Sequence, residues 1–504
     1  MNKLAPFIEP RKADPRFAAP MRFQMLINGQ SVDAASGETL TRESPAYEGV
    51  IVSEIPNGSA KDSERAILAA RRAFDEGHWP RMSGADRARR IARLGELIHA
   101  HREELALIEC LEVGKTLEQA RGEMNYSAEL WSYAAGHARG LEGESHNDFG
   151  PGALGLMLRQ PIGVVGIVTP WNFPLLIGSE RVPWALGAGC CVVVKPSEFT
   201  SGSTIRMAEL AREAGIPDGV INVVTGYGNP VGQLFAEHPA CDMINFTGSF
   251  RVGQIVGGLA AARIKRVGLE LGGKGPAIVF ADANLEAAAD TIARSIFGGQ
   301  GQACISNSRM IVQREVKDAM LERLVHIASN VTVGDPLDPR TKIGAMIHRP
   351  HMEKVERYVT EGIRDGAGLV VGGRRLSNSG NYFAPTIFSE AAAHMSVTRD
   401  EIFGPVLAVQ TFDTPEEATR LANDTNYGLS ANVWTNDLGK AVQTIRAVRA
   451  GRTWINGAGT GGPEMGISGF RQSGMGRELG RGGFDEYSTL KNVYVVLEHG
   501  GAWI

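Results

Sequence analysis

The segment PIGVVGIVTPWNFP, residues 161–174, decides the fold. Its run Ile162–Thr169 is short, apolar and rich in β-branched residues, which predicts a buried strand that ends in a turn fixed by two prolines. Similar runs recur at 191–194, 221–225 and 243–247, with helical patterns between them at 201–214 and 250–261. This alternation predicts βαβ units in a parallel sheet, which binds ligands at the carboxyl ends of its strands.

On either side of this core the pattern changes. Upstream, residues 23–32 resemble a hairpin, and the chain to about residue 140 is expected to be mostly helical. Downstream, a second α/β region begins near Leu269, with a strand at 277–280 and a helix at 284–297 that the glycine-rich run 298–304 interrupts. The tail 491–497 is expected to form an edge strand that reaches another part of the molecule or another subunit.

Composition narrows the class of protein. A chain of 504 residues is too long for one core, so two or three domains are expected. The formal charge of −4 gives no electrostatic case for nucleic acid or an anionic membrane. No apolar stretch is long enough to span a bilayer, and we see no secretory signal. The five cysteines show neither a disulfide framework nor zinc-site spacing, which indicates a reducing, cytoplasmic setting and no bound metal.

Three polar residues are candidates for chemistry. Cys304 follows a run of glycines that permits close ligand approach, so its thiolate could act as a nucleophile; an inert buried thiol is the alternative. Glu270 ends a predicted strand among apolar residues and could act as a general base, or form a salt bridge to Lys265 or Lys274. Asn172, in the turn after the first strand, could donate to an oxyanion or simply form the turn.

Other residues suit a nucleotide cofactor. Lys195 and Glu198 follow a strand, where they could bind ribose hydroxyls or form a solvated pair. The glycine run 226–232 resembles the dinucleotide-binding fingerprint but has one extra residue before its last glycine. Gly248 and Ser249 open a helix whose backbone N–H groups could face a pyrophosphate, although Ser249 could equally cap the helix.

Seven motifs occur in order: Val168–Pro174, Lys195–Glu198, Phe246–Ser249, Leu269–Lys274, Gly301–Cys304, Glu401–Val406 and Ser473–Glu478. With them the chain resembles the aldehyde dehydrogenase superfamily, of the NAD(P)-dependent, non-acylating type, over roughly residues 23–497. The resemblance implies that Cys304 attacks the aldehyde, that Asn172 stabilises the oxyanion, and that Glu270 activates the water that hydrolyses the thioester. Glu478 matches a second acid, proposed to relay protons.

The resemblance also implies a cofactor site. Lys195 and Glu198 would hold the adenosine ribose, Gly228 and Gly232 would line the adenine side, and Gly248 and Ser249 would meet the pyrophosphate. Glu401 would hold the nicotinamide ribose and Phe403 would lie against the ring, with Thr169 and Trp171 also at the cofactor. Because a carboxylate at Glu198 would repel a 2′-phosphate, NAD is favoured over NADP.

The family fold implies an α/β architecture with a Rossmann-type cofactor domain, an α/β catalytic domain and a small bridging β-element. The corresponding ranges are 1–145 with 161–271, then 272–486, and 146–160 with 487–504. Members are usually dimers or tetramers, so a homodimer or homotetramer is expected. A small aldehyde is the expected substrate, with neither nucleic acid nor membrane as a partner.

The chain departs from its relatives at Glu180-Arg181, where many of them have Trp-Lys. A carboxylate in place of an aromatic side chain, together with Gly298 and Gly299 before Cys304, suggests a roomier and less apolar substrate tunnel. Our hypothesis is that Glu180 favours a cationic aldehyde; the alternative is an internal contact of Glu180 with Arg181 or with its helix.

Three rivals remain. A catalytically silent relative would lack Cys304 or Glu270, and both are present. A CoA-acylating enzyme would not need Glu270 to activate water. A cofactor-independent cysteine hydrolase would need a histidine partner, and none is near Cys304 in the sequence.

Overall fold

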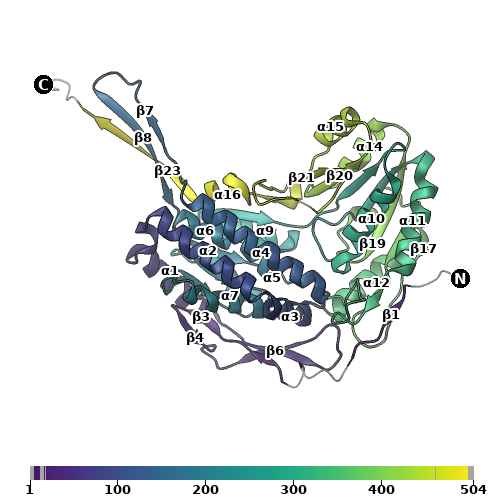
Figure 1. The fold of residues 1–504 in the computed structure, drawn as a ribbon, viewed down its shortest axis with the longest axis horizontal. Coiled ribbons are helices and arrows are strands. Elements are labelled where there is room, and N and C mark those ends of the chain that lie inside the picture. The colour runs from purple at the N-terminus through teal and green to yellow at the C-terminus, as the bar shows by residue number, and fades with distance from the viewer. Residues whose placement is uncertain (1–4, 12–15, 17–18, 460, 498–504) are drawn as a thin grey trace.

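A computed structural model describes residues 5–11, 16, 19–459 and 461–497 (Figure 1). The chain folds around two large sheets, one of eight strands and one of seven, with three small sheets at their margins. The α/β architecture predicted from the alternating pattern is confirmed.

The eight-stranded sheet has the strand order β22-β13-β12-β9-β10-β11-β3-β4. Its five central strands are parallel: β9 (Val164–Val168), β10 (Cys191–Lys195), β11 (Ile221–Val223), β12 (Met243–Thr247) and β13 (Arg266–Glu270). The antiparallel strands are β3 (Met25–Ile27), β4 (Gln30–Val32) and β22 (Gly474–Met475). From β9 the chain runs outward through β10 and β11, then returns to place β12 on the other side of β9. This reversal is the point at which doubly wound sheets bind their ligands.

Helices pack around this sheet and share one apolar core with it. They are α1 (Ala60–Asp75), α2 (Gly84–Ala100), α3 (Arg102–Val113), α4 (Leu117–Ala138), α5 (Pro174–Ser179), α6 (Val182–Ala188), α7 (Gly202–Glu213), α8 (Gln233–Glu237) and α9 (Phe250–Ala261). In α2, Ile91, Leu94 and Ile98 are fully buried at the spacing of one helix face, while Arg89 and Arg93 lie toward solvent.

One part of the N-terminal prediction is wrong. The hairpin is present as β3 and β4, but the segment after it is not helical. β6 (Ile51–Pro56) pairs with both β5 (Thr39–Glu43) and β2 (Met21–Arg22) in a three-stranded sheet. β5 is mostly polar and exposed, so it lacks the apolar periodicity that marks a buried strand.

The seven-stranded sheet has the order β17-β18-β19-β15-β14-β20-β21. Its strands are β14 (Pro276–Val279), β15 (Arg309–Gln313), β17 (Gly368–Val371), β18 (Thr386–Ser389), β19 (Val406–Phe412), β20 (Ser430–Trp434) and β21 (Arg452–Ile455). Its helices are α10 (Leu285–Phe297), α11 (Lys317–Asn330), α12 (Arg349–Arg364), α13 (Ser396–Arg399), α14 (Pro415–Asn423) and α15 (Leu438–Ala447). The predicted helix at 284–297 is α10, and Asn284 caps it by accepting a hydrogen bond from the N–H of Ala287 at 3.1 Å.

A long ribbon stands away from the rest of the chain (Figure 1). It is made of β7 (Glu144–His146), β8 (Ala153–Pro161) and β23 (Ser488–Val496), and β23 pairs with β8 along its whole length. The C-terminal edge strand expected at 491–497 is therefore confirmed as part of β23. Residues 498–504 of the predicted bridging element lie outside the described residues.

Two short pairings join distant parts of the chain. β1 (Phe7–Ile8) pairs with β16 (Val333–Gly334), and β22 closes the eight-stranded sheet just before α16 (Gly480–Glu486). The division of the chain into the three ranges expected above stays a prediction. Within the described residues, no helix combines the length and apolar character needed to cross a bilayer.

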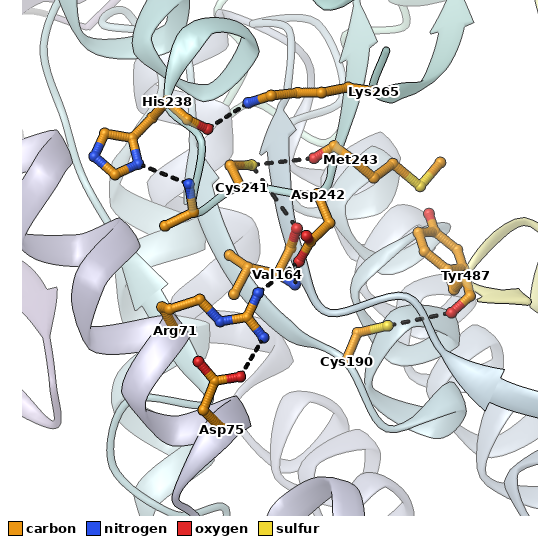
Figure 2. Close-up of polar contacts among 11 residues, drawn as sticks. Arg71, Asp75, Val164, Cys190, His238, Cys241, Asp242, Met243, Lys265 and Tyr487 are labelled. Atoms are coloured by element: carbon orange, nitrogen blue, oxygen red, sulfur yellow. Dashed lines mark hydrogen bonds and ion pairs between the residues drawn. The ribbon is translucent and has the colours of Figure 1, made fainter. Parts of the chain in front are cut away.

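The amino-terminal edge of the eight-stranded sheet is closed by polar contacts (Figure 2). The Asp242 carboxylate accepts hydrogen bonds from the N–H of Val164 at 2.7 Å and from Arg71 at 2.8 Å. The Cys190 thiol donates to the carbonyl of Tyr487 at 3.3 Å, which ties the start of the ribbon to this edge. These side chains hold the sheet together at the end opposite the carboxyl ends of its strands.

Candidate active site

The side chains predicted to be functional gather where the parallel strands end. β9 leads into the turn 169–174, β10 ends at Lys195, β12 ends at Thr247 and β13 ends at Glu270. The hydroxyl oxygens of Thr169 and Thr247 are buried and have no hydrogen-bond partner within the described residues. Since a buried hydroxyl is normally satisfied, this edge of the sheet suits a polar ligand.

Cys304 is the one cysteine of the five that is only half-buried; the other four are buried. It lies on the loop between a short helical turn (Gly298–Gly301) and β15. Burial, followed by the carboxylates of Glu401 and Glu270, raises the pKa of the Cys304 thiol to about 12. The resting side chain is therefore a thiol, which must lose its proton before it can attack.

Asn172 contacts the loop of Cys304 directly. Its buried side-chain N–H donates to the carbonyl oxygen of Gln302 at 2.8 Å. An Asn amide carries two N–H groups, so one remains for a second acceptor. This contact joins the turn after β9 to the cysteine loop, as an oxyanion role requires.

Glu270 is a buried carboxylate without a cation bound to it. Its Oε1 has no hydrogen-bond partner within the described residues, and burial, followed by Glu478, raises its pKa well above the ordinary value. The alternative of a salt bridge is wrong, because Lys265 donates to the carbonyls of Phe235 and His238, and no ion pair joins Glu270 to Lys274 in the described structure.

Arg181 places a positive charge near the carboxyl groups of Glu270 and Glu478. Its guanidinium forms an ion pair with Glu478, and both side chains are buried. Burial also raises the pKa of Glu478, while Arg181 opposes that increase. The predicted second acid is thus held by a cation that cannot itself deliver a proton, because a guanidinium stays charged.

Glu180 ends α5 beside this cluster and is half-buried. Burial and then Glu478 raise its pKa to about 7, although Arg452 and then Arg181 oppose the increase. Arg452 begins β21, and its guanidinium lies 5.4 Å from the ring centre of Trp454. It forms no ion pair with any described residue, and its charge also acts on Cys304.

The adenosine side of the predicted cofactor site is built around Lys195. Its Nζ is buried, donates to the carbonyl of Pro196 at 2.8 Å and lies 4.0 Å from a carboxylate oxygen of Glu198. Burial lowers the pKa of Lys195 to about 8. A Cβ at Gly232 would approach the Lys195 stem to 3.1 Å, whereas one at Gly228 would meet open space.

The helix predicted to face a pyrophosphate begins as expected, and two N–H groups near its start are engaged within the protein. Ser249 caps α9 by accepting a hydrogen bond from the N–H of Val252 at 3.4 Å, and Gly248 donates its N–H to the carbonyl of Glu270 at 3.1 Å. The capping alternative for Ser249 is thus confirmed, and its contact with a pyrophosphate stays a prediction.

The segment 401–406 carries the nicotinamide-side candidates. Glu401 accepts a hydrogen bond from the N–H of Gly273 at 2.9 Å, close after Glu270. The ring of Phe403 stands edge-on to that of Trp171, with centres 5.4 Å apart at 89°. The structure thereby brings together the turn after β9, the end of β13 and the segment before β19.

Sequence reasoning missed two residues of this region. Arg452 lies in no motif, and only its long-range proximity to Glu180 marks it. His351, on α12, donates to the carbonyl of Phe403. Among the described residues, no three His, Cys, Asp or Glu side chains gather as a metal ion would require.

Comparisons with known proteins agree with this geometry. The family model described as "Aldehyde dehydrogenase family" matches residues 32–493. The chain is similar to a betaine aldehyde dehydrogenase from Bacillus subtilis (40% identical over 474 residues, covering 93% of this chain and 96% of that protein). The crystal structure of an NAD-dependent aldehyde dehydrogenase from Sinorhizobium meliloti is 59% identical, with a TM-score of 0.98 and 99% of both chains covered. An indole-3-acetaldehyde dehydrogenase solved with NAD+ is 41% identical, with a TM-score of 0.93, and the match covers 96% of this chain and 98% of that one. The chain therefore belongs to the aldehyde dehydrogenase family.

Proposed function

We propose that this protein oxidises an aldehyde to a carboxylic acid with NAD+, using Cys304 as the nucleophile. This proposal rests on the hydrogen bond of 2.8 Å from the Asn172 side chain to the Cys304 loop. Glu270 adds a buried carboxyl group whose Oε1 has no hydrogen-bond partner within the described residues. An amide donor, a half-buried thiol and a buried base are the groups that covalent aldehyde oxidation needs.

The residues at the carboxyl edge fit a dinucleotide. Thr169 and Thr247 offer unpartnered buried hydroxyls, Lys195 and Glu198 offer a donor and an acceptor, and Gly228 leaves open space. Lys195, Glu198 and Glu401 would hold the two riboses, and Phe403 and Trp171 would flank the nicotinamide. Glu198 supports NAD+ over NADP+, since its carboxylate would repel a 2′-phosphate.

The first step is attack by sulfur on the aldehyde carbon. The thiol proton leaves to Glu270, and the C=O bond becomes a C–O⁻ that the free N–H of Asn172 and the backbone N–H of Cys304 stabilise. When NAD+ is bound, its nicotinamide supplies the acceptor for the hydride that leaves this carbon, so that the adduct becomes a thioester.

Hydrolysis completes the reaction. Glu270 first passes the thiol proton on toward Glu478. It then removes a proton from water, which adds to the thioester carbon, and the Cys304 thiolate leaves as the acid forms. The raised pKa of Glu270 makes its carboxylate a stronger base than an exposed one. Arg181 opposes this increase, and Glu478 is the next carboxylate available to the proton.

The charged side chains around Glu180 are compatible with two kinds of aldehyde substrate. Similar relatives are named for a cationic aldehyde and for an indole aldehyde, at 40% and 41% identity. Glu180 supports a cationic substrate, but Arg452 and Arg181 both act on its charge. If Glu180 selects cations, Glu180→Gln should lower kcat/KM for an amino-aldehyde and leave that of a neutral aldehyde of equal length unchanged; equal effects on both would reject the idea.

We also propose that the protein assembles as a homodimer or homotetramer and works in the cytoplasm. The ribbon of β8 and β23 supports assembly, because it stands away from the rest of the chain (Figure 1) and exposes the side chains of Leu158, Tyr494 and Val496. All five cysteines are free, which suits a reducing compartment.

The test is reduction of NAD+ by purified protein, followed by NADH absorbance with aliphatic, aromatic, carboxylate-bearing and amino-aldehydes. Cys304→Ala should abolish turnover and retain NAD+ binding. Acyl-CoA formation when CoA is added would point to the acylating chemistry instead. Turnover that survives in Cys304→Ala would refute the proposed mechanism.

A further inference from the structure

Phe403 adopts a backbone conformation that a residue with a side chain avoids. Its φ is 62°, in the left-handed region, where the Cβ crowds the following carbonyl. Such a conformation persists only when neighbouring groups hold it, and at a ligand site it usually serves to place a side chain.

The group that holds Phe403 is the imidazole of His351. A ring nitrogen, Nε2, lies 2.7 Å from the carbonyl oxygen of Phe403, and His351 is buried. Because a carbonyl oxygen can only accept, Nε2 must carry the hydrogen. Burial lowers the pKa of His351 to about 4, so the ring is neutral at working pH and keeps this one tautomer.

The same ring is part of an aromatic cluster made by three segments of the chain. The ring centre of His351 lies 5.6 Å from that of Trp171 and 6.1 Å from that of Phe403, and Trp171 and Phe403 are 5.4 Å apart. Each pair meets edge to face, the arrangement that aromatic rings prefer. The turn after β9, helix α12 and the segment before β19 therefore meet at His351.

The segment also packs against the glycine turn that precedes the Cys304 loop. A Cβ at Gly301 would lie only 2.2 Å from the carbonyl oxygen of Gly404, so the residue after Phe403 packs directly on the loop that carries Cys304. On the other side, Lys354 donates to the carbonyl of Glu401 at 3.5 Å, also from α12. The whole segment is thus fixed from one helix.

We infer that His351 is a positioning residue: its Nε2–H holds the strained Phe403 carbonyl so that the Phe403 ring faces the nicotinamide end of the cofactor. This rests on the proposed function, in which Phe403 and Glu401 bind that end of NAD+. His351 acts through Phe403 rather than by touching the reacting atoms.

Three variants test this inference. His351→Phe keeps an aromatic ring and removes the donor, His351→Gln keeps an N–H donor without the ring, and Tyr358→Phe is the matched control. Tyr358 lies on the same helix and bonds to Asp400 at 3.3 Å, so its variant removes a different link to the same segment. For each protein we would measure the NAD+ dissociation constant by titration, kcat with the best aldehyde, the alkylation rate of Cys304 without cofactor, and the melting temperature.

His351→Phe should weaken NAD+ binding about tenfold, because it leaves the Phe403 carbonyl without its donor. His351→Gln should recover most of that loss, Tyr358→Phe should match the wild type, and Cys304 alkylation should stay unchanged in all. If His351→Phe melts too low for titration, His351→Leu replaces it as the variant without a donor.

Two results would overturn the inference: NAD+ binding and kcat within twofold of wild type when the donor is lost, or a Gln variant as impaired as the Phe variant. The proposed function is judged separately by the wild type. A wild-type protein that binds NAD+ but turns over no aldehyde refutes that function, while the ratios between variants still decide the role of His351.

Discussion

Replacing Arg181 with methionine removes the cation that pairs with the buried carboxylate of Glu478. The side chain of Arg181 is 1% exposed and that of its partner Glu478 is 9% exposed, so solvent cannot compensate for the lost charge. Removing one partner of a buried pair costs about 3–5 kcal/mol. For 504 residues, at an unfolding entropy of about 2 cal/mol/K per residue, this corresponds to a fall in melting temperature of about 3–5 °C.

The stability lost in Arg181→Met should depend on pH, and the direction of this dependence follows from the pKa of Glu478. Without Arg181, the pKa of Glu478 rises further above its unfolded value, so the folded protein keeps a proton that the unfolded chain releases. The free energy of unfolding then falls as pH rises from the unfolded pKa toward the raised folded pKa. The deficit of Arg181→Met should be small at pH 5 and fully developed at pH 9.

The assay is thermal unfolding of wild type, Arg181→Met and Arg181→Lys at pH 5, 7 and 9, with kcat measured over the same range. Arg181→Lys keeps the charge and should lose less than the methionine variant. In Arg181→Met the rising limb of kcat should move to higher pH, because the pKa of Glu270 also increases. Equal deficits at pH 5 and pH 9, or a lysine variant as unstable as the methionine variant, would show that shape rather than charge sets the cost.

Three further substitutions test the site. Asn172→Ala should lower kcat about 10²–10³-fold with unchanged NAD+ binding, in steady-state and titration measurements; a smaller loss would remove Asn172 from the oxyanion site. Glu270→Gln should lower the pKa of Cys304, so that alkylation at pH 8 becomes faster, and should slow steady-state turnover because the base for the thiol and for water is lost; unchanged alkylation would contradict the electrostatic link. Gly272→Ala would place a Cβ 2.3 Å from Oε2 of Glu401 and should raise the KM for NAD+ about tenfold, and an unchanged KM would show that Glu401 does not bind the cofactor.

The sequence predicts the parallel core well, because buried strands and capped helices carry strong local signals. The strand 243–247 and the helix 250–261 coincide with β12 and α9, and the serine before the helix caps it. The strand expected at 162–169 is shorter in the structure, since Pro161 ends β8 and β9 begins at Val164. The sheet of β2, β5 and β6 is missed because its strands are short or polar and are specified by their partners rather than by their own pattern.

The ion pairs and pKa values of the site are harder to predict from the sequence than the identity of its residues. The motifs identify Cys304, Glu270 and Asn172, but no local pattern shows that Arg181 bonds to Glu478 rather than to its neighbour Glu180. That preference arises only when the C-terminal segment folds back against α5 and α6. Burial then sets the pKa values, and burial is a property of the assembled fold.

Arg181 and Arg452 differ in their surroundings, and this difference affects which substrates Glu180 could select. Arg181 is buried and paired with Glu478, and its charge opposes the increase in the pKa values of Glu478 and Glu270. Arg452 has no ion pair within the described structure, although its charge acts on Glu180, Cys304 and Glu270. If the substrate enters beside Glu180, it meets a carboxyl group together with a guanidinium that has no ion pair among the described residues. An aldehyde that carries only a cation would be attracted by the first and repelled by the second, whereas one that carries both charges could satisfy both. For this reason the carboxylate-bearing and amino-aldehydes belong in the same substrate panel, and the response of each to Glu180→Gln separates selection by Glu180 from simple charge balance with Arg452.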